Sequence, residues 1–120
     1  SLSILAVKVI LKLLNFNSED WIKNYIFIEL ELLKYIGFDL NIKEFCKYEV
    51  INNLKKYFID TSSRKLIVPN FLLEDNYNDI SDNDIYNSLI LISEFMKKNI
   101  FIPNSINFPI SRLNFINNFR

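Results

Sequence analysis

The stretch that decides the fold is ELELLKYIGF, residues 29–38. Its aliphatic residues recur at helical spacing, and Gly37 is the residue type best able to take the left-handed conformation that ends a helix. Toward the N-terminus, Ser-Glu-Asp at residues 18–20 indicates a helix start, because serine caps free N–H groups and acids suit the helix dipole. The sequence therefore predicts a long helix from Trp21 to about Ile36.

Three further helices are predicted around this one. Residues 2–15 are apolar except for a narrow polar stripe, which favours either a central core helix or a helix that docks on a preceding portion of the chain. Residues 82–100 follow Ser81, which is placed to form a capping box with Asp84. Their expected buried face comprises Ile85, Leu89, Ile92 and Met96. A short last helix begins near Pro109, a residue favoured in the first turn.

The segments between the helices predict little further regular structure. Residues 38–50 show no clean period and are interpreted as an irregular connector. Residues 54–59 and 65–68 are β-prone, and residues 60–64 supply turn chemistry, so a β-hairpin is expected there. The predicted fold class is mainly α: a small helical bundle of three main helices plus a short C-terminal helix, with one short β-hairpin, in a single domain over residues 1–120.

Composition excludes several classes of function. The chain has no histidine, the usual general base and metal ligand, and its one glycine excludes a glycine-rich phosphate loop. The single cysteine, Cys46, excludes an internal disulfide and a cysteine-rich zinc cluster, and it fits a reducing compartment. The apolar run at residues 2–14 is too short to span a bilayer. We therefore expect a cytoplasmic, non-enzymatic protein with no metal or other cofactor and no membrane partner.

Two segments together resemble a known family. The first is residues 29–38, which is similar to the pattern Glu-Leu-x-Leu-Leu, two residues, an aliphatic residue, Gly and an aromatic. The second is Pro-Ile-Ser-Arg at residues 109–112, which is similar to a Pro-aliphatic pair before an arginine that opens a final helix. Both patterns resemble the C-terminal helical domain of RecO, the bacterial recombination mediator. The predicted hairpin from Tyr57 to Val68, followed by residues 69–73, is most similar to the α-proteobacterial members. The resemblance spans roughly residues 10–119.

The resemblance implies a DNA repair and recombination function carried out by binding partner proteins. The implied partners are RecR and the tail of single-stranded DNA-binding protein. RecO also has an N-terminal oligonucleotide-binding (OB) domain, for which this chain shows no counterpart, and some members carry a four-cysteine zinc site where this chain has only Cys46. Two alternatives remain open: a module that directly binds or anneals single-stranded DNA, and an unrelated helical protein-interaction domain.

Glu29 is the most informative candidate residue. It falls in the middle of the apolar arc of the predicted 21–36 helix, where an isolated carboxylate costs several kcal/mol unless it is paired or neutral. The chain has three arginines, and Arg112 belongs to the second family-like segment. We therefore predict a structural ion pair between Glu29 and Arg112 that joins the last helix to the long one.

A basic group is the second candidate site, for contact with nucleic acid or a partner. Between residues 43 and 65 the bases outnumber the acids by six to three. The group consists of Lys43, Lys47, Lys55, Lys56, Arg64 and Lys65. Aromatic residues at 48, 57 and 58 are interleaved, and aromatics beside cations can stack on bases. The alternative is an ordinary solvated face, which suits the overall balance of 14 bases and 14 acids.

A groove for an acidic-hydrophobic tail is the third candidate site. Such a groove requires an apolar trough with a cation at its rim. Lys23 and Lys34 on the 21–36 helix and Lys97 and Lys98 near the end of the 82–100 helix are the candidate cations. Cys46 is interpreted as a connector or core residue, because no histidine is present to activate its thiol.

Overall fold

The computed structural model describes residues 21–74 and 79–120. The chain divides into two compact units, the first ending at Leu40 and the second running from Asn41 to Arg120. The predicted helix over residues 2–15 and the predicted cap at residues 18–20 lie outside the described residues. The expectation of a single domain over residues 1–120 stays a prediction.

Helix α2, Trp21–Tyr35, is the regular element described in the first unit. It ends as its sequence predicts, because Gly37 has a φ of 96°. The Phe38 N–H donates to the Leu33 carbonyl at 2.8 Å, and the Gly37 N–H donates to the Lys34 carbonyl at 3.1 Å. These two hydrogen bonds form a Schellman motif, which satisfies carbonyl groups that the end of a helix leaves free.

The second unit contains a three-stranded antiparallel sheet in the order β1-β2-β3. Its strands are β1, Lys47–Ile51, β2, Leu54–Asp60, and β3, Lys65–Ile67. A two-residue loop joins β1 to β2, and both of its residues, Asn52 and Asn53, have positive φ, 53° and 64°. Positive φ at both loop residues is the requirement of a type I′ turn, whose twist matches that of a hairpin.

The sheet shows that the predicted fold class was wrong. The second unit combines helices with a three-stranded sheet, so the protein is mixed α and β and not a helical bundle with one hairpin. The β2–β3 hairpin lies at the predicted place, but β1 begins inside residues 38–50, which were interpreted as an irregular connector, and it ends at Ile51. All five residues of β1 are exposed. Polar and apolar residues do alternate from Lys47 to Val50, but this signal covers only four residues.

Short helical segments flank the sheet. Helix α3, Ile42–Phe45, leads into β1, and the 3₁₀-helix η1, Asn70–Leu72, follows β3. Leu66 of β3 is buried, as are Val68 and Phe71 beyond it. These side chains bring the segment after β3 into the core of the second unit.

Helix α4, Asp82–Met96, contributes the largest buried face among the described elements. The predicted capping box is present: the Asp84 N–H donates to Ser81 Oγ, and the Ser81 N–H donates to Asp84 Oδ2, both at 3.1 Å. Three of the four residues expected on its buried face are buried, Ile85, Leu89 and Ile92, whereas Met96 is half-buried. The helix contacts both β3 and α5, and it therefore organises the core of the second unit.

The chain beyond Met96 differs from the predicted continuous helix. It continues as one turn of π-helix, Lys97–Phe101 (η2), closed by a hydrogen bond from the Ile102 N–H to the Lys97 carbonyl at 2.9 Å. Ser105 then takes a φ of 54° and ends the segment. Helix α5, Ile110–Asn117, follows and begins after Pro109 as predicted. Within residues 21–74 and 79–120, no helix has the length and apolarity needed to cross a membrane.

The β1–β2 turn can be tested at Asn53. Replacing Asn53 with alanine adds a residue that tolerates positive φ poorly, so we expect the free energy of unfolding to fall by about 1 kcal/mol. Replacing it with glycine is expected to be tolerated. Urea unfolding followed by circular dichroism measures both changes. Ser62→Ala, in the β2–β3 turn at negative φ, is the control. Equal stabilities of Asn53→Ala and Ser62→Ala would contradict the turn assignment.

Candidate functional site: the β1–β2 hairpin

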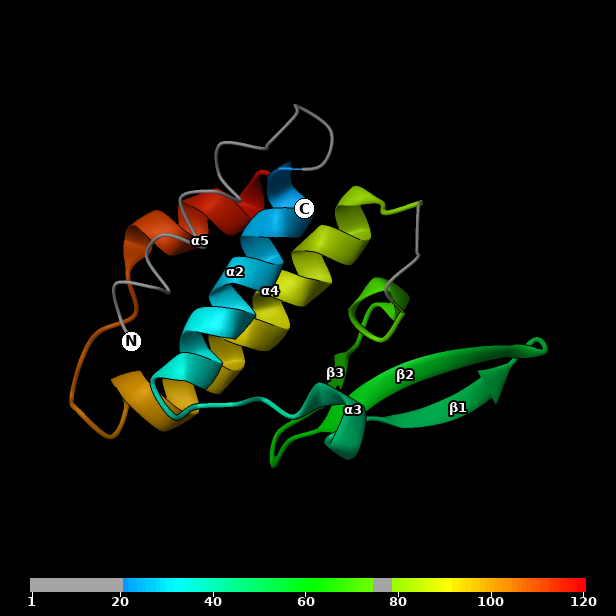
Figure 1. Ribbon diagram of the computed structural model, residues 1–120, viewed down its shortest axis with the longest axis horizontal. Helices are drawn as coiled ribbons and strands as arrows, with labels where there is room; N and C mark the ends of the chain where they lie inside the picture. Colours follow the sequence, from blue (N-terminus) through cyan, green and yellow to red (C-terminus); the bar gives the residue numbers. More distant parts are fainter. Residues whose placement is uncertain (1–20, 75–78) are drawn as a thin grey trace. The chain divides into compact units, whose positions relative to one another are not determined.

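The β1–β2 hairpin extends beyond the rest of the sheet. Strand β3 pairs with β2 only over Phe58–Asp60, whereas β1 pairs with β2 along its whole length, from Lys47 opposite Phe58 to Ile51 opposite Leu54. The two strands therefore continue past β3 as a two-stranded ribbon (Figure 1). All five residues of β1 are exposed, as are the first three residues of β2, so this part of the hairpin presents both of its faces to solvent.

The pairing register sorts the side chains of the hairpin onto two faces. Successive residues of a strand point to opposite faces, and residues directly opposite each other point to the same face. The tyrosine face carries Tyr48, Val50, Lys55 and Tyr57. The charged face carries Lys47, Glu49, Lys56 and Phe58, together with Asp60 and Lys65, and the apolar pair Ile51 and Leu54 at the tip of the hairpin. The residues of the predicted basic group that lie on the hairpin, and the aromatic residues between them, are thus divided between two faces.

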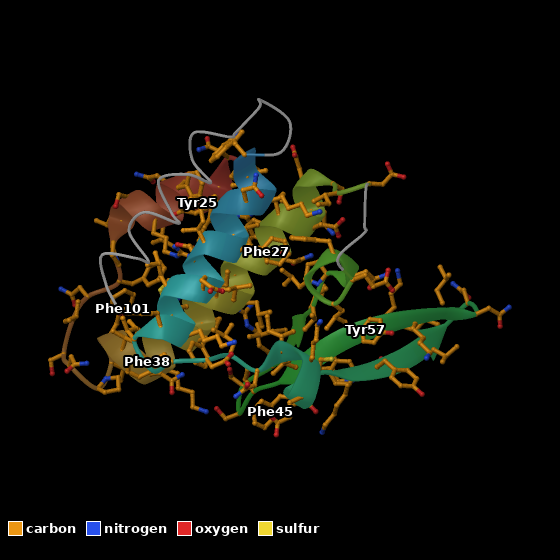
Figure 2. All side chains as sticks on the ribbon, in the orientation of Figure 1. Tyr25, Phe27, Phe38, Phe45, Tyr57 and Phe101 are labelled. Atoms are coloured by element: carbon orange, nitrogen blue, oxygen red, sulfur yellow. The ribbon has the colours of Figure 1, made fainter. Side chains whose placement is uncertain are left out.

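Each face of the sheet holds a lysine over an aromatic ring. On the tyrosine face, the rings of Tyr48 and Tyr57 lie 6.1 Å apart between centroids, and Lys55 Nζ lies 4.5 Å from the centre of the Tyr48 ring. Figure 2 shows Tyr57 on this ribbon. On the charged face, Lys65 Nζ lies 4.4 Å from the centre of the Phe58 ring. These cation–π contacts occupy ring faces that a nucleic-acid base would otherwise stack upon.

Carboxylates form ion pairs with three of the six residues of the predicted basic group. Lys47 pairs with Asp60 at 3.4 Å, Lys65 pairs with Glu49, and Arg64 pairs with Glu94 of α4 at 3.2 Å. The hydrogen bond to Glu49 raises the pKa of the Lys65 ammonium, with further help from the charges of Glu49 and Asp60. These exposed pairs add little stability, but they lower the charge offered to a phosphate.

The remaining members of the basic group do not form one patch. Lys55 lies on the tyrosine face, Lys56 lies on the charged face, and Lys43 lies on α3. Within the described part of the chain, none of these three lysines forms an ion pair. The structure therefore brings four of the six predicted cations onto the sheet, on two faces, and leaves Lys43 and Arg64 on neighbouring segments.

Exposed apolar side chains are the feature of the hairpin that the sequence interpretation missed. On the tyrosine face, Val50 is 63% exposed and Tyr48 is exposed beside it; on the opposite face, Leu54 is 60% exposed and Ile51 is exposed beside it. The run Tyr-Glu-Val-Ile directly before Asn-Asn carries the signal, because β-branched and aromatic residues followed by a two-residue turn indicate a hairpin strand. Patches of this kind on a protein surface mark sites of interaction.

The predicted Glu29–Arg112 ion pair stays a prediction, because its members lie in different units. Glu29 Oε2 accepts a hydrogen bond from the Tyr25 hydroxyl at 3.1 Å. Arg112 Nε donates to Ser93 Oγ at 2.7 Å, and the Ser93 hydroxyl donates to the Leu89 carbonyl at 2.6 Å. The sequence interpretation named neither Tyr25 nor Ser93 as a partner of these charged groups.

The candidates for a tail-binding groove also stay predictions. Lys97 Nζ lies 3.4 Å from Glu94 Oε1 and 4.6 Å from the centre of the Phe108 ring, so it is already engaged within the second unit. Lys34 and Lys98 are exposed, and Lys23 is half-buried. The Cys46 thiol is half-buried and lies 3.9 Å from the Lys43 carbonyl. Among the described residues, no three His, Cys, Asp or Glu side chains gather as metal ligands would.

No family model, curated protein or solved structure matches this chain. The resemblance to RecO therefore rests on residues 29–38 and 109–112. In the structure, the first segment contains the C-terminal half of α2 and its Schellman motif, and the second contains the start of α5. Both segments are ends of helices, where the choice of residue follows from capping as well as from ancestry.

Ser93 and Ser88 offer a matched test of the Arg112 contact. Both serines are buried in α4, and each hydroxyl donates to the carbonyl four residues earlier, but only Ser93 Oγ also accepts from Arg112 Nε. Ser93→Ala removes a charge-assisted hydrogen bond, so we expect it to lower the free energy of unfolding by about 1–2 kcal/mol more than Ser88→Ala does. Urea unfolding of the two variants measures the difference. Equal losses would show that the contact contributes nothing to stability.

Proposed function

We propose that this chain is a non-enzymatic protein-interaction domain whose partner-binding surface is the β1–β2 hairpin. The observation that carries the proposal is the exposure of Tyr48, Val50, Ile51 and Leu54 on a ribbon that no other described strand covers. Covering these side chains removes apolar area from water, and that burial is the main driving force for protein association. Aromatic side chains at the centre of such a surface supply the strongest anchors.

The charge arrangement favours a protein partner over a nucleic acid. Nucleic-acid binding draws most of its affinity from cations that neutralise phosphates and release counterions. Lys47, Lys65 and Arg64 are instead opposed by carboxylates of the same chain. A protein partner requires no net charge at its contact surface, and the rim of an interface is ordinarily polar.

The class of partner comes from the resemblance to RecO. We propose a cytoplasmic bacterial recombination mediator domain that binds RecR and the tail of single-stranded DNA-binding protein. Two observations support this class: residues 29–38 close α2, and the Pro-Ile-Ser-Arg segment opens α5 with Arg112 in its first turn.

The proposal predicts that purified RecR binds the hairpin. A carboxylate in the centre of an apolar contact is desolvated without a partner, so Val50→Asp and Leu54→Asp are each expected to weaken RecR binding at least about tenfold. Ile110→Asp is the control, because Ile110 is 73% exposed on α5, away from the sheet. Isothermal titration calorimetry measures the affinities. Equal affinities for the hairpin variants and the control would rule out the hairpin as the site, and no RecR binding at all would rule out the assigned partner.

The second candidate function is binding of single-stranded DNA, which Lys43, Lys55 and Lys56 favour, because none of them forms an ion pair in the described part of the chain. A labelled oligothymidylate titrated at several salt concentrations tests it. Since half of the basic group is matched by acids, we expect weak binding that is lost by about 150 mM salt. Lys55→Ala is expected to weaken whatever binding remains, and Lys98→Ala, on η2, is the control. Tight binding with a steep salt dependence would favour this function over the first.

A further inference from the structure

Strand β1 is an open edge of the sheet. The order β1-β2-β3 leaves one side of β1 without a neighbouring strand, and within the described residues its ladder runs to β2 alone. Proteins usually protect such an edge with a proline, a bulge, a very short strand, charged side chains or a covering segment. Strand β1 is five residues long, lacks proline and glycine, pairs without a bulge and is exposed throughout, and its two charged residues, Lys47 and Glu49, are of opposite sign. An edge of this kind is a template for pairing with another strand.

The backbone of Tyr48 points out of this edge. The Val68 N–H donates to the Tyr57 carbonyl at 3.0 Å, so Tyr57 directs its backbone groups toward the β3 side of β2. Residues along an antiparallel strand alternate in this direction, and Tyr48 lies directly opposite Tyr57. Tyr48 therefore directs its own N–H and C=O away from β2, where a new strand can accept and donate hydrogen bonds.

The sequence of β1 is complementary to itself in one antiparallel register. With Tyr48 opposite Tyr48 of a second copy, Lys47 lies opposite Glu49 and Glu49 lies opposite Lys47. The next pair outward is Val50 opposite Cys46, a small apolar residue. Aromatic pairs and opposite charges are the cross-strand combinations that stabilise a sheet. This register also uses the outward backbone groups of Tyr48.

Neighbouring registers lose this complementarity. Centring the pairing on Glu49 places two carboxylates opposite each other, and centring it on Lys47 places two ammonium groups opposite each other. Like charges directly opposite are destabilising. Centring it on Val50 places Glu49 opposite Ile51. A shift by one residue places Tyr48 opposite Lys47 or Glu49, because it exchanges the two faces of the strand.

We infer that two copies of this chain associate by antiparallel pairing of their β1 strands about a two-fold axis at Tyr48. A second copy is then one partner of the hairpin, and this pairing rests on the proposed role of that hairpin in protein binding. The two sheets become one sheet of six strands, and the exposed tyrosine faces of the two copies become continuous. One strand from each copy buries little area, so the dimer is weak and depends on concentration.

The test uses charge reversal at the two residues that face each other across the axis. Lys47→Glu sets two carboxylates opposite each other, and Glu49→Lys sets two ammonium groups together, so each single variant is expected to weaken dimerisation about tenfold. Sedimentation equilibrium of the full chain from about 10 µM to about 1 mM measures the dissociation constant in the range expected for a small interface. Circular dichroism melting confirms that each variant folds.

Mixing the two variants separates pairing between copies from effects within one copy. In the mixture, a Lys47→Glu chain meets a Glu49→Lys chain, and opposite charges again face each other at both positions. Each chain still carries its own altered contact with Asp60 or Lys65, so those defects are not repaired by mixing. We expect the mixture to dimerise within about twofold of the unaltered protein. Recovery on mixing therefore supports pairing in the Tyr48 register.

Three results would overturn the inference: an unaltered chain that remains monomeric at about 1 mM, single variants that dimerise as well as the unaltered chain, or a mixture that stays monomeric. The outcome is separable from that of the proposed function. If the chain is monomeric but RecR binding is lost in Val50→Asp, only the second-copy partner is wrong. If the chain dimerises but RecR does not bind, only the RecR assignment is wrong.

Discussion

The left-handed turn at Asn52 and Asn53 is the constraint on which the functional surface depends. A loop of two residues at positive φ fixes which residue of β1 faces which residue of β2, because so short a loop sets Ile51 directly opposite Leu54. That register sets Tyr48 against Tyr57 and places Lys55 where its ammonium group covers the Tyr48 ring. A slip of one residue would move every side chain of β1 to the other face and dissolve these contacts.

The same register explains why a basic stretch of sequence becomes a nearly balanced surface. Lys47 and Asp60 are thirteen residues apart in the chain, and Lys65 and Glu49 are sixteen apart, but the sheet brings each pair together. Charges that compensate each other in this way leave apolar contact as the larger contribution to any binding at the hairpin. What the hairpin can bind thus depends on which side chains are neighbours, and the excess of bases in the sequence does not reveal this.

Local rules predicted the ends of the helices well. Gly37 closes α2, the Ser81–Asp84 box opens α4 and Pro109 precedes α5, because each of these features depends on residues within one turn of the chain. Strand β1 and the Arg112–Ser93 contact were not predicted. The alternation of polar and apolar residues in β1 covers only four residues, and Ser93 is a small polar residue on the face of a helix that its pattern marks as apolar. Strand β1 and the Arg112–Ser93 contact both depend on contacts between residues that are distant in the sequence. The predicted Glu29–Arg112 pair also depends on such a contact.

The two edges of the sheet differ in a way that limits assembly. Strand β1 is long and exposed, whereas β3 has three residues, and it contacts α4. A sheet with two equivalent open edges can add copies at both sides and grow into a fibre. A sheet with one open edge pairs with the same edge of a second copy. The resulting dimer has no open edge to which a third copy can add. The short strand beside α4 thus acts as a terminator, favouring a closed pair over an open-ended polymer.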